Sequence, residues 1–338
     1  MRRSRALAGA AGAAGAASAL GMAGYVAQRA AVRRWRVDAE AMEAAGRAMP
    51  GDVRHHFVPV DDGGRIHAVE RGSGPPVVLV HGVTLGVATW IPQLHQLARH
   101  HRVVAVGQRG HGQSIAGHDD YSLERLAADL TEVLGALEVS GAVLVGHSMG
   151  GMVAQLMALE DPEATAARVA GLVLVATTAG PLVPTLVGAA VASALAGGAG
   201  RGLRRAGRKG RGLFPRDDLG AWIARTCFGR HPAPADIELT RSMIAAMSPS
   251  AMAGLIGPLL AFDVHRRVAA IDLPTRVVVG SRDVLTPPRT ARALAGRIPG
   301  ATLTVLAGCG HMVMFERVEE LDDLVVRFAG QLRAAAGP

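Results

Sequence analysis

A single serine stands among glycines in the segment "VLVGHSMGGMV", residues 143 to 153. Apolar, β-branched residues precede this serine, and an apolar segment compatible with a helix follows it. A sharp turn from strand to helix at Ser148 needs neighbours without bulk, because strand and helix approach closely there, and Gly146 and Gly150 meet that need. Such a turn strains the serine backbone and exposes its hydroxyl at the edge of a sheet. The pattern is typical of a nucleophilic serine.

A serine hydroxyl is a weak nucleophile, so a base must take its proton and a further group must orient the base. For this kind of turn the acid is expected after the serine and the histidine last. The segment "SRDVLTPP" follows one apolar run and contains Asp283, which could instead simply cap its loop. The segment "GCGHMVMFE" follows the last apolar run and contains His311. We therefore predict Ser148 as the nucleophile, His311 as the base and Asp283 as the orienting acid.

The charge that develops on a substrate oxygen during such a reaction needs hydrogen-bond donors. The backbone amide of Met149, at the start of the helix after the serine, is one candidate. The other should come from the loop "HGVTLGVATW", residues 81–90, and we assign it to the amide of Val83. His81 is better suited to anchoring this loop than to chemistry.

These residues must be positioned by regular elements, and the chain alternates short apolar, β-branched runs with helix-length segments. The runs lie at residues 56–60, 65–71, 76–81, 102–107, 142–146, 171–177, 275–280 and 302–306. Helices are expected at 90–99, 122–137, 149–159, 289–298 and 318–334. The turn "DDGG" joins the first two runs as a hairpin. The later alternation predicts an α/β fold with a mostly parallel sheet and helices on both faces.

The rhythm breaks between Pro181 and Ala270, where no clear core strand appears. We predict a helical cap at 181–270, inserted between strands 6 and 7 and covering the edge where open α/β sheets bind ligands. The core would then comprise residues 53–180 and 271–338. Residues 37–52 are expected to form a linker.

The charge distribution argues against a nucleic-acid partner. The net charge is +8, but seven arginines lie within the first 36 residues with no acid among them, so the remainder is nearly neutral. A nucleic-acid-binding domain needs a basic face on its folded body. Cys227 and Cys309 are too few for a disulfide framework or a zinc site and are expected to be free thiols. No phosphate-binding loop or His/Cys cluster points to a cofactor or a metal.

The N-terminal segment 1–36 resembles a membrane anchor or a signal sequence. Residues 6–27 carry no charge, are long enough to span a bilayer as a helix, and have arginines on both sides. Their many alanines and glycines make them only weakly apolar. A cleaved signal, with export, and a tail on a cytoplasmic protein remain alternatives. An apolar stretch followed by a basic one within 182–216 could also dock the cap on an anionic membrane.

Five segments, "HGVTLGVATW", "GQRGHGQS", "GHSMGG", "GSRDVLTPP" and "GCGHMVMFE", together resemble the α/β-hydrolase superfamily over residues 55–335. The branch that they resemble is the capped esterase and lipase-like one, which includes cofactor-free haloperoxidases and monoglyceride lipases. The resemblance implies an eight-stranded, mostly parallel sheet, a mobile cap and hydrolysis through an acyl-enzyme formed on Ser148. Gly107 departs from the family pattern, which usually has an acid there, so some local loss of order is expected.

The resemblance leaves several functions open. Hydrolysis of a carboxylic ester with an apolar acyl group is the first, and C–C, lactone or amide hydrolysis or perhydrolysis with the same three residues are alternatives. A non-catalytic binding protein of the same fold is another. Haloalkane dehalogenases and epoxide hydrolases need a carboxylate where this chain has Ser148, which argues against both. Neither the substrate nor the oligomeric state follows from the sequence.

Overall fold

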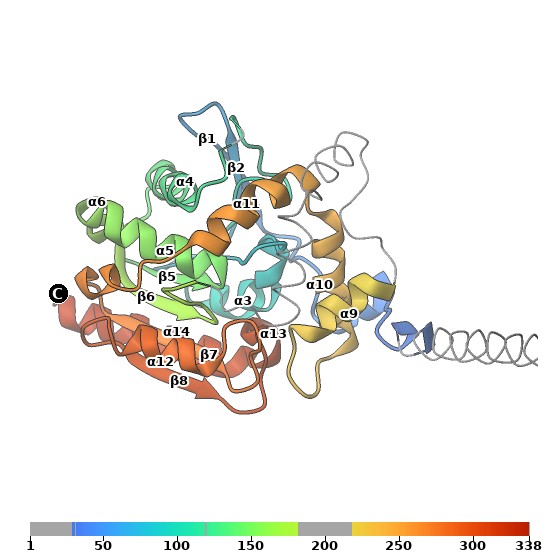
Figure 1. Ribbon diagram of the computed structural model, residues 1–338. Coiled ribbons are helices and arrows are strands. Elements are labelled where there is room, and N and C mark those ends of the chain that lie inside the picture. Colours follow the sequence, from blue (N-terminus) through green and yellow to red (C-terminus); the bar gives the residue numbers. More distant parts are fainter. Residues whose placement is uncertain (1–28, 31, 119, 182–217, 338) are drawn as a thin grey trace, which may run out of the picture.

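The computed structural model describes residues 29–337 except 31, 119 and 182–217 (Figure 1). Its centre is an eight-stranded sheet with the strand order β1-β2-β4-β3-β5-β6-β7-β8. The strands are β1 (Arg54–Pro59), β2 (Arg65–Arg71), β3 (Pro76–Val80), β4 (Arg102–Val106), β5 (Ala142–His147), β6 (Val169–Val175), β7 (Thr275–Gly280) and β8 (Thr302–Leu306). Each strand coincides with one of the predicted runs to within about two residues.

The sheet is parallel except at one side. β1 pairs antiparallel with β2 through the predicted hairpin, and β2 pairs antiparallel with β4. All pairs from β4 through β3, β5, β6 and β7 to β8 are parallel. The loops that follow the parallel strands therefore lie at one common edge, which is where the predicted functional residues occur.

Helices cover both faces, because alternate side chains of each central strand point in opposite directions. Val78 and Val80 of β3 pack in one core cluster with α4, α5 and α12. Val77 and Leu79 pack in the other with α3 and α14. The helices of this core are α3 (Ile91–Gln96), α4 (Leu123–Ala136), α5 (Met149–Glu160), α6 (Pro162–Arg168), α12 (Pro288–Ala295), α13 (Val313–Glu316) and α14 (Val318–Ala336), with 3-10 turns η1 (Val87–Trp90), η2 (Leu97–Arg99) and η4 (Arg267–Ala270).

Three helices occupy the described part of the segment predicted as a cap: α9 (Asp218–Thr226), α10 (Pro234–Ala246) and α11 (Pro249–Ala261) (Figure 1). They contact the loops after two strands. Thr89, after β3, donates to Met243 Sδ on α10 at 3.5 Å. A Cβ on Gly110, after β4, would lie 2.5 Å from Ala251 on α11. These contacts place the helices at the loop edge of the sheet, as a cap requires. The exact division into core and cap stays a prediction.

The segment predicted as a linker packs against this insertion. It contains α2 (Ala39–Ala44), and the ring of Trp35 lies edge-on to Trp222 of α9 with 5.0 Å between centroids. Arg47 forms an ion pair with the buried Asp236 of α10 at 2.5 Å. Residues 32–49 are therefore held against the folded body instead of spanning free between two parts.

The predicted membrane segment, residues 6–27, lies outside the described residues, as does the apolar and basic stretch of 182–216. Within the described ranges no single helix is long and apolar enough to cross a membrane. α10 and α11 together meet that test of length and composition, but they meet at a bend of 99°. Buried residues of both helices pack into the core clusters, for example Ile237 and Leu255.

Candidate active site

Ser148 occupies the turn between β5 and α5 in a conformation rarely adopted by side-chain-bearing residues, with φ 52° and ψ −117°. The neighbouring glycines make this turn possible. A Cβ on Gly146 would approach the carbonyl oxygen of Gly150 to 2.5 Å, and one on Gly150 would approach that of Val80 to 2.2 Å. Both contacts are with backbone, which cannot move aside. The steric reason inferred from the sequence is thus present in the structure.

Hydrogen bonds fix the backbone of the serine on both sides. Its N–H donates to Val175 O at 2.9 Å, and Thr177 Oγ1 donates to its carbonyl oxygen at 2.7 Å. The side chain is half-buried, and Ser148 Oγ makes no hydrogen bond within the described part of the chain. These contacts hold the strained backbone of Ser148 in place, and its hydroxyl is left available to react.

Asp283 and His311 are joined by a buried hydrogen bond of 2.8 Å between Oδ2 and Nδ1. They are 3% and 5% exposed. The carboxylate also accepts from Leu285 N, from Thr286 N and from Thr286 Oγ1, at 2.7 to 2.9 Å. Burial by itself would raise the pKa of Asp283, but the interactions with His311 and Thr286 outweigh it and lower that pKa. The carboxylate therefore stays charged and holds the ring with its proton on Nδ1.

The backbone of His311 is tied to two other parts of the site. Its N–H donates to Cys227 O, which follows α9, at 2.7 Å. Its carbonyl oxygen accepts from His147 Nε2 at 3.1 Å, and the rings of His147 and His311 lie 4.7 Å apart. Since His147 immediately precedes Ser148, this contact brings His311 and Asp283 to the serine turn. No hydrogen bond joins Ser148 to His311 among the described residues.

The two predicted oxyanion amides flank the serine. A Cβ on Gly82 would lie 3.0 Å from Ser148 Cβ, so the loop carrying Val83 passes directly beside the nucleophile. Met149 begins α5, where backbone N–H groups lack partners within the helix. In the described ranges, neither the Val83 N–H nor the Met149 N–H has a protein acceptor. Both donors are therefore free for a substrate oxygen.

This arrangement can be compared with known proteins. A family model described as the alpha/beta hydrolase fold matches residues 75–318, most of the chain. The chain belongs to the alpha/beta hydrolase family.

Relatives of this chain carry the names of hydrolases and esterases. RutD of Variovorax paradoxus, provisionally named as a carbamate hydrolase, is 33% identical over 71% of this chain and 85% of its own. The esterase RhEst1 from Rhodococcus sp. ECU1013 is 27% identical, with a TM-score of 0.67 over 83% of this chain and 99% of its own. A thermophilic esterase from Thermogutta terrifontis is 25% identical, with a TM-score of 0.69 over 82% and 99%. Hydrolases and esterases thus resemble this chain over most of its length.

His81 anchors the loop that carries Val83. Its Nδ1–H donates to Gly82 O at 2.8 Å, so Nε2 is free to accept from Gln108 N at 3.0 Å. Burial lowers the pKa of His81 to about 3, which keeps the ring neutral. The anchoring role expected from the sequence matches these bonds.

The backbone at Gly107 is hydrogen-bonded on both sides, and the local loss of order expected there stays a prediction. The Gly107 N–H donates to His67 O at 2.9 Å, and its carbonyl oxygen accepts from Ser114 Oγ at 2.7 Å. A Cβ at Gly107 would lie 3.1 Å from His67 O and 3.3 Å from Ser114 Oγ. The position is filled by close backbone packing.

The sequence did not single out three further polar residues beside the site. His111 accepts from Thr84 N–H, the side chain of Gln108 donates to His81 O, and His147 donates to His311 O. The motifs "GHSMGG" and "GQRGHGQS" contain all three, but only the convergence of the loops reveals their partners. Elsewhere in the chain, Cys227 and Cys309 are free thiols. No group of three or more His, Cys, Asp or Glu within the described residues could hold a metal.

Proposed function

We propose that this protein is a serine hydrolase that cleaves a carboxylic ester through an acyl-enzyme. The observation that carries the proposal is the strained Ser148 beside a buried Asp283–His311 pair. A nucleophile, an oriented base and two free amides are the groups that acyl transfer needs. The esterases and hydrolases among the related proteins support the same class of reaction.

In the proposed reaction, Ser148 Oγ attacks the acyl carbon while His311 Nε2 takes the hydroxyl proton. The Nδ1–H of His311 stays bonded to Asp283, which stabilises the imidazolium. The electron pair of the broken π bond moves to the carbonyl oxygen, which the amides of Val83 and Met149 bind. The ester C–O bond then breaks, and His311 returns its proton to the leaving alkoxide. A water attacks the acyl-enzyme with the same base, releasing the acid and restoring the serine.

The first prediction concerns the nucleophile. An active-site fluorophosphonate probe should label the wild-type protein and should not label Ser148→Ala, because the probe bonds covalently to an activated serine. The measurement is in-gel fluorescence and mass spectrometry of the labelled peptide. Ser250→Ala, at an exposed serine on α11, is the control and should label like the wild type. Absence of labelling in the wild type would contradict the proposal and favour a non-catalytic binding protein.

The alternatives that share this machinery differ in the bond that breaks. The provisional name of RutD points to carbamates. A p-nitrophenyl ester should therefore be compared with the matching p-nitrophenyl carbamate and amide, and with a set of lactones. An ester preference, seen as the highest kcat/KM in that set, supports the proposal. A clear preference for a carbamate, an amide or a lactone would assign the same residues to that reaction.

We also propose that the protein associates with a membrane through residues 6–27. The uncharged length of this segment and its flanking arginines support the proposal. An apolar acyl substrate would be at hand on such a surface.

A further inference from the structure

The turn "RGHG", residues 109–112, reaches the loop that carries the Val83 amide. His111 is 1% exposed. Its Nε2 accepts from Thr84 N–H at 3.2 Å, and its Nδ1 lies 3.0 Å from Arg109 O. Because a carbonyl oxygen can only accept, the ring proton is on Nδ1 and Nε2 is free to accept. His111 therefore joins two loops in one tautomer, and its deeply buried ring leaves it neutral.

Thr84 needs such support, because its backbone is strained. Its φ is 63°, which is unfavourable for a β-branched residue. Strained conformations of this kind persist only where the surroundings hold them. The next N–H, that of Leu85, donates to Gly82 O at 3.3 Å. The bonds donated by the Thr84 and Leu85 N–H groups thus hold a tight turn over residues 82–85. The Val83 N–H within this turn has no partner among the described residues.

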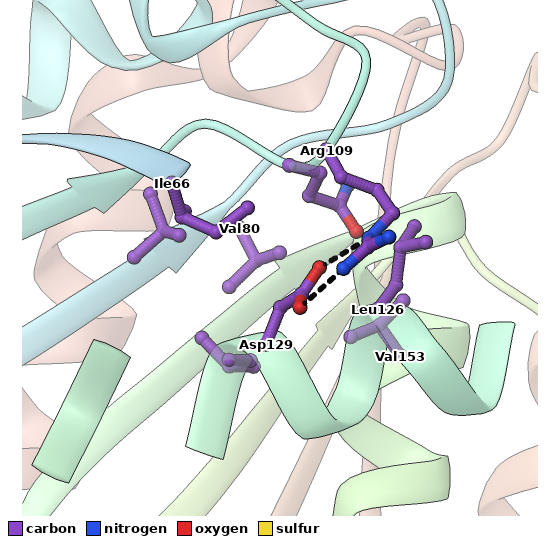
Figure 2. Close-up of a pocket in the computed structure, with 9 residues that line it drawn as sticks. Ile66, Val80, Arg109, Leu126, Asp129 and Val153 are labelled. Carbon is purple, nitrogen blue, oxygen red and sulfur yellow. Dashed lines mark hydrogen bonds and ion pairs between the residues drawn. The ribbon is translucent and has the colours of Figure 1, made fainter. Parts of the chain in front are cut away.

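The far end of this connection is rigid. Figure 2 shows Arg109 and Asp129 of α4 facing each other at a cavity of about 10 Å³. The guanidinium is fully buried and binds both carboxylate oxygens, at 2.6 and 2.8 Å. It also donates to Asp62 at 2.8 Å. Bidentate pairs of this kind fix geometry as well as charge. The carbonyl oxygen of Arg109, which accepts the hydrogen bond from His111 Nδ1–H, is therefore anchored to α4.

We propose that His111 is a positioning residue that aims the Val83 amide at the reaction centre, with the Arg109–Asp129 pair as its fixed support. The inference rests on the proposed function, since the amide matters only if an oxyanion forms. Without the acceptor at His111, Thr84 relaxes toward an unstrained conformation and turns the Val83 peptide away. The substrate still binds, but its transition state loses one donor.

The test compares His111→Phe with His118→Phe in the full chain. His118 follows the same turn with an exposed side chain, so its substitution should leave turnover unchanged. On a p-nitrophenyl ester, His111→Phe should lower kcat by about 100-fold, the usual effect of losing one oxyanion donor, with KM changed by less than about twofold. His111→Gln keeps an acceptor within reach of Thr84 and should recover most of the loss. His111→Asn, which is too short, should not.

Amide hydrogen exchange of Thr84 provides a readout that does not need catalysis. Exchange should be faster in His111→Phe and His111→Asn than in the wild type and His111→Gln, with melting temperatures confirming that each variant is folded. Unchanged exchange, or a folded His111→Phe with wild-type kcat, would overturn the inference. If the wild-type protein has no hydrolase activity but exchange responds as expected, the proposed function fails while the coupling between His111 and the loop stands.

Discussion

At the scale of single residues, the proposed chemistry depends on ring protons that buried hydrogen bonds hold in place. Asp283 fixes the tautomer of His311, and backbone carbonyls fix those of His81 and His111. The nucleophile, acid and base could be nominated from the sequence because strand ends and glycines mark them. His111 and His147 could not, because their partners lie in loops far apart in the sequence. The catalytic roles of all these residues stay predictions.

One buried carboxyl away from the site should make stability depend on pH. Asp322 on α14 donates nothing and accepts only from Gln93 at 3.1 Å, and its Oδ2 has no partner among the described residues. Burial raises the pKa of Asp322 to about 7. Between roughly pH 4 and pH 7 the unfolded chain has lost this proton while the folded chain retains it, so stability falls as pH rises.

Asp322→Asn should remove this dependence. Relative to the wild type, its free energy of unfolding should rise by roughly 3 kcal/mol between pH 4 and pH 7, measured by urea titration. Glu319→Gln, at an exposed carboxyl on the same helix, is the control and should follow the wild-type curve closely. Parallel curves for wild type and Asp322→Asn would show that the carboxyl does not titrate in this range.

At the scale of elements, the sequence predicted all eight strands because each is a short run with apolar or β-branched residues bounded by turn residues, even in β1 and β8, most of whose residues are exposed or only partly buried. Two short helices were missed. α6, of seven residues, and α13, of four, are too short to show a helical period. The linker expected at residues 37–52 stays a prediction. Its composition is polar and does not reveal that Arg47 pairs with Asp236 of α10.

The buried Arg109, which pairs with Asp129 of α4 and with Asp62 of the β1–β2 hairpin, should be a major source of stability. Asp129→Asn leaves Asp62 as the one carboxylate paired with the buried Arg109 among the described residues, so the free energy of unfolding should fall by roughly 3 kcal/mol, as for other broken buried pairs. Glu160→Gln removes an exposed pair with Arg267 and should change it by less than about 1 kcal/mol. Chemical denaturation measures both. Equal losses would mean that burial of the arginine pair has no special weight.

At the scale of the whole molecule, the N-terminal region has two parts. Residues 6–27 are the proposed attachment, whereas Val32 is 1% exposed and Trp35 contacts α9. A truncation that respects this boundary ends before residue 29. Removal of residues 1–36, the segment marked by sequence alone, would also take away packed side chains.

Deletion of residues 1–28 should therefore release the protein from the membrane fraction without changing its melting temperature or its esterase kcat. Deletion of residues 1–36 should lower the melting temperature as well, because Val32 and Trp35 leave the packed body. Cell fractionation and thermal melts distinguish the two. If the protein without residues 1–28 still sediments with membranes, attachment lies elsewhere in the chain.

The bond from His311 N–H to Cys227 O has a consequence for access to the site. It links His311, the proposed general base, to the segment directly after α9, within the insertion that we predict to be a cap. An outward movement of α9, to admit a larger molecule, would pull on the loop that carries His311. Bulky substrates should then slow the chemical step more than they weaken binding, so that the insertion selects substrates by size.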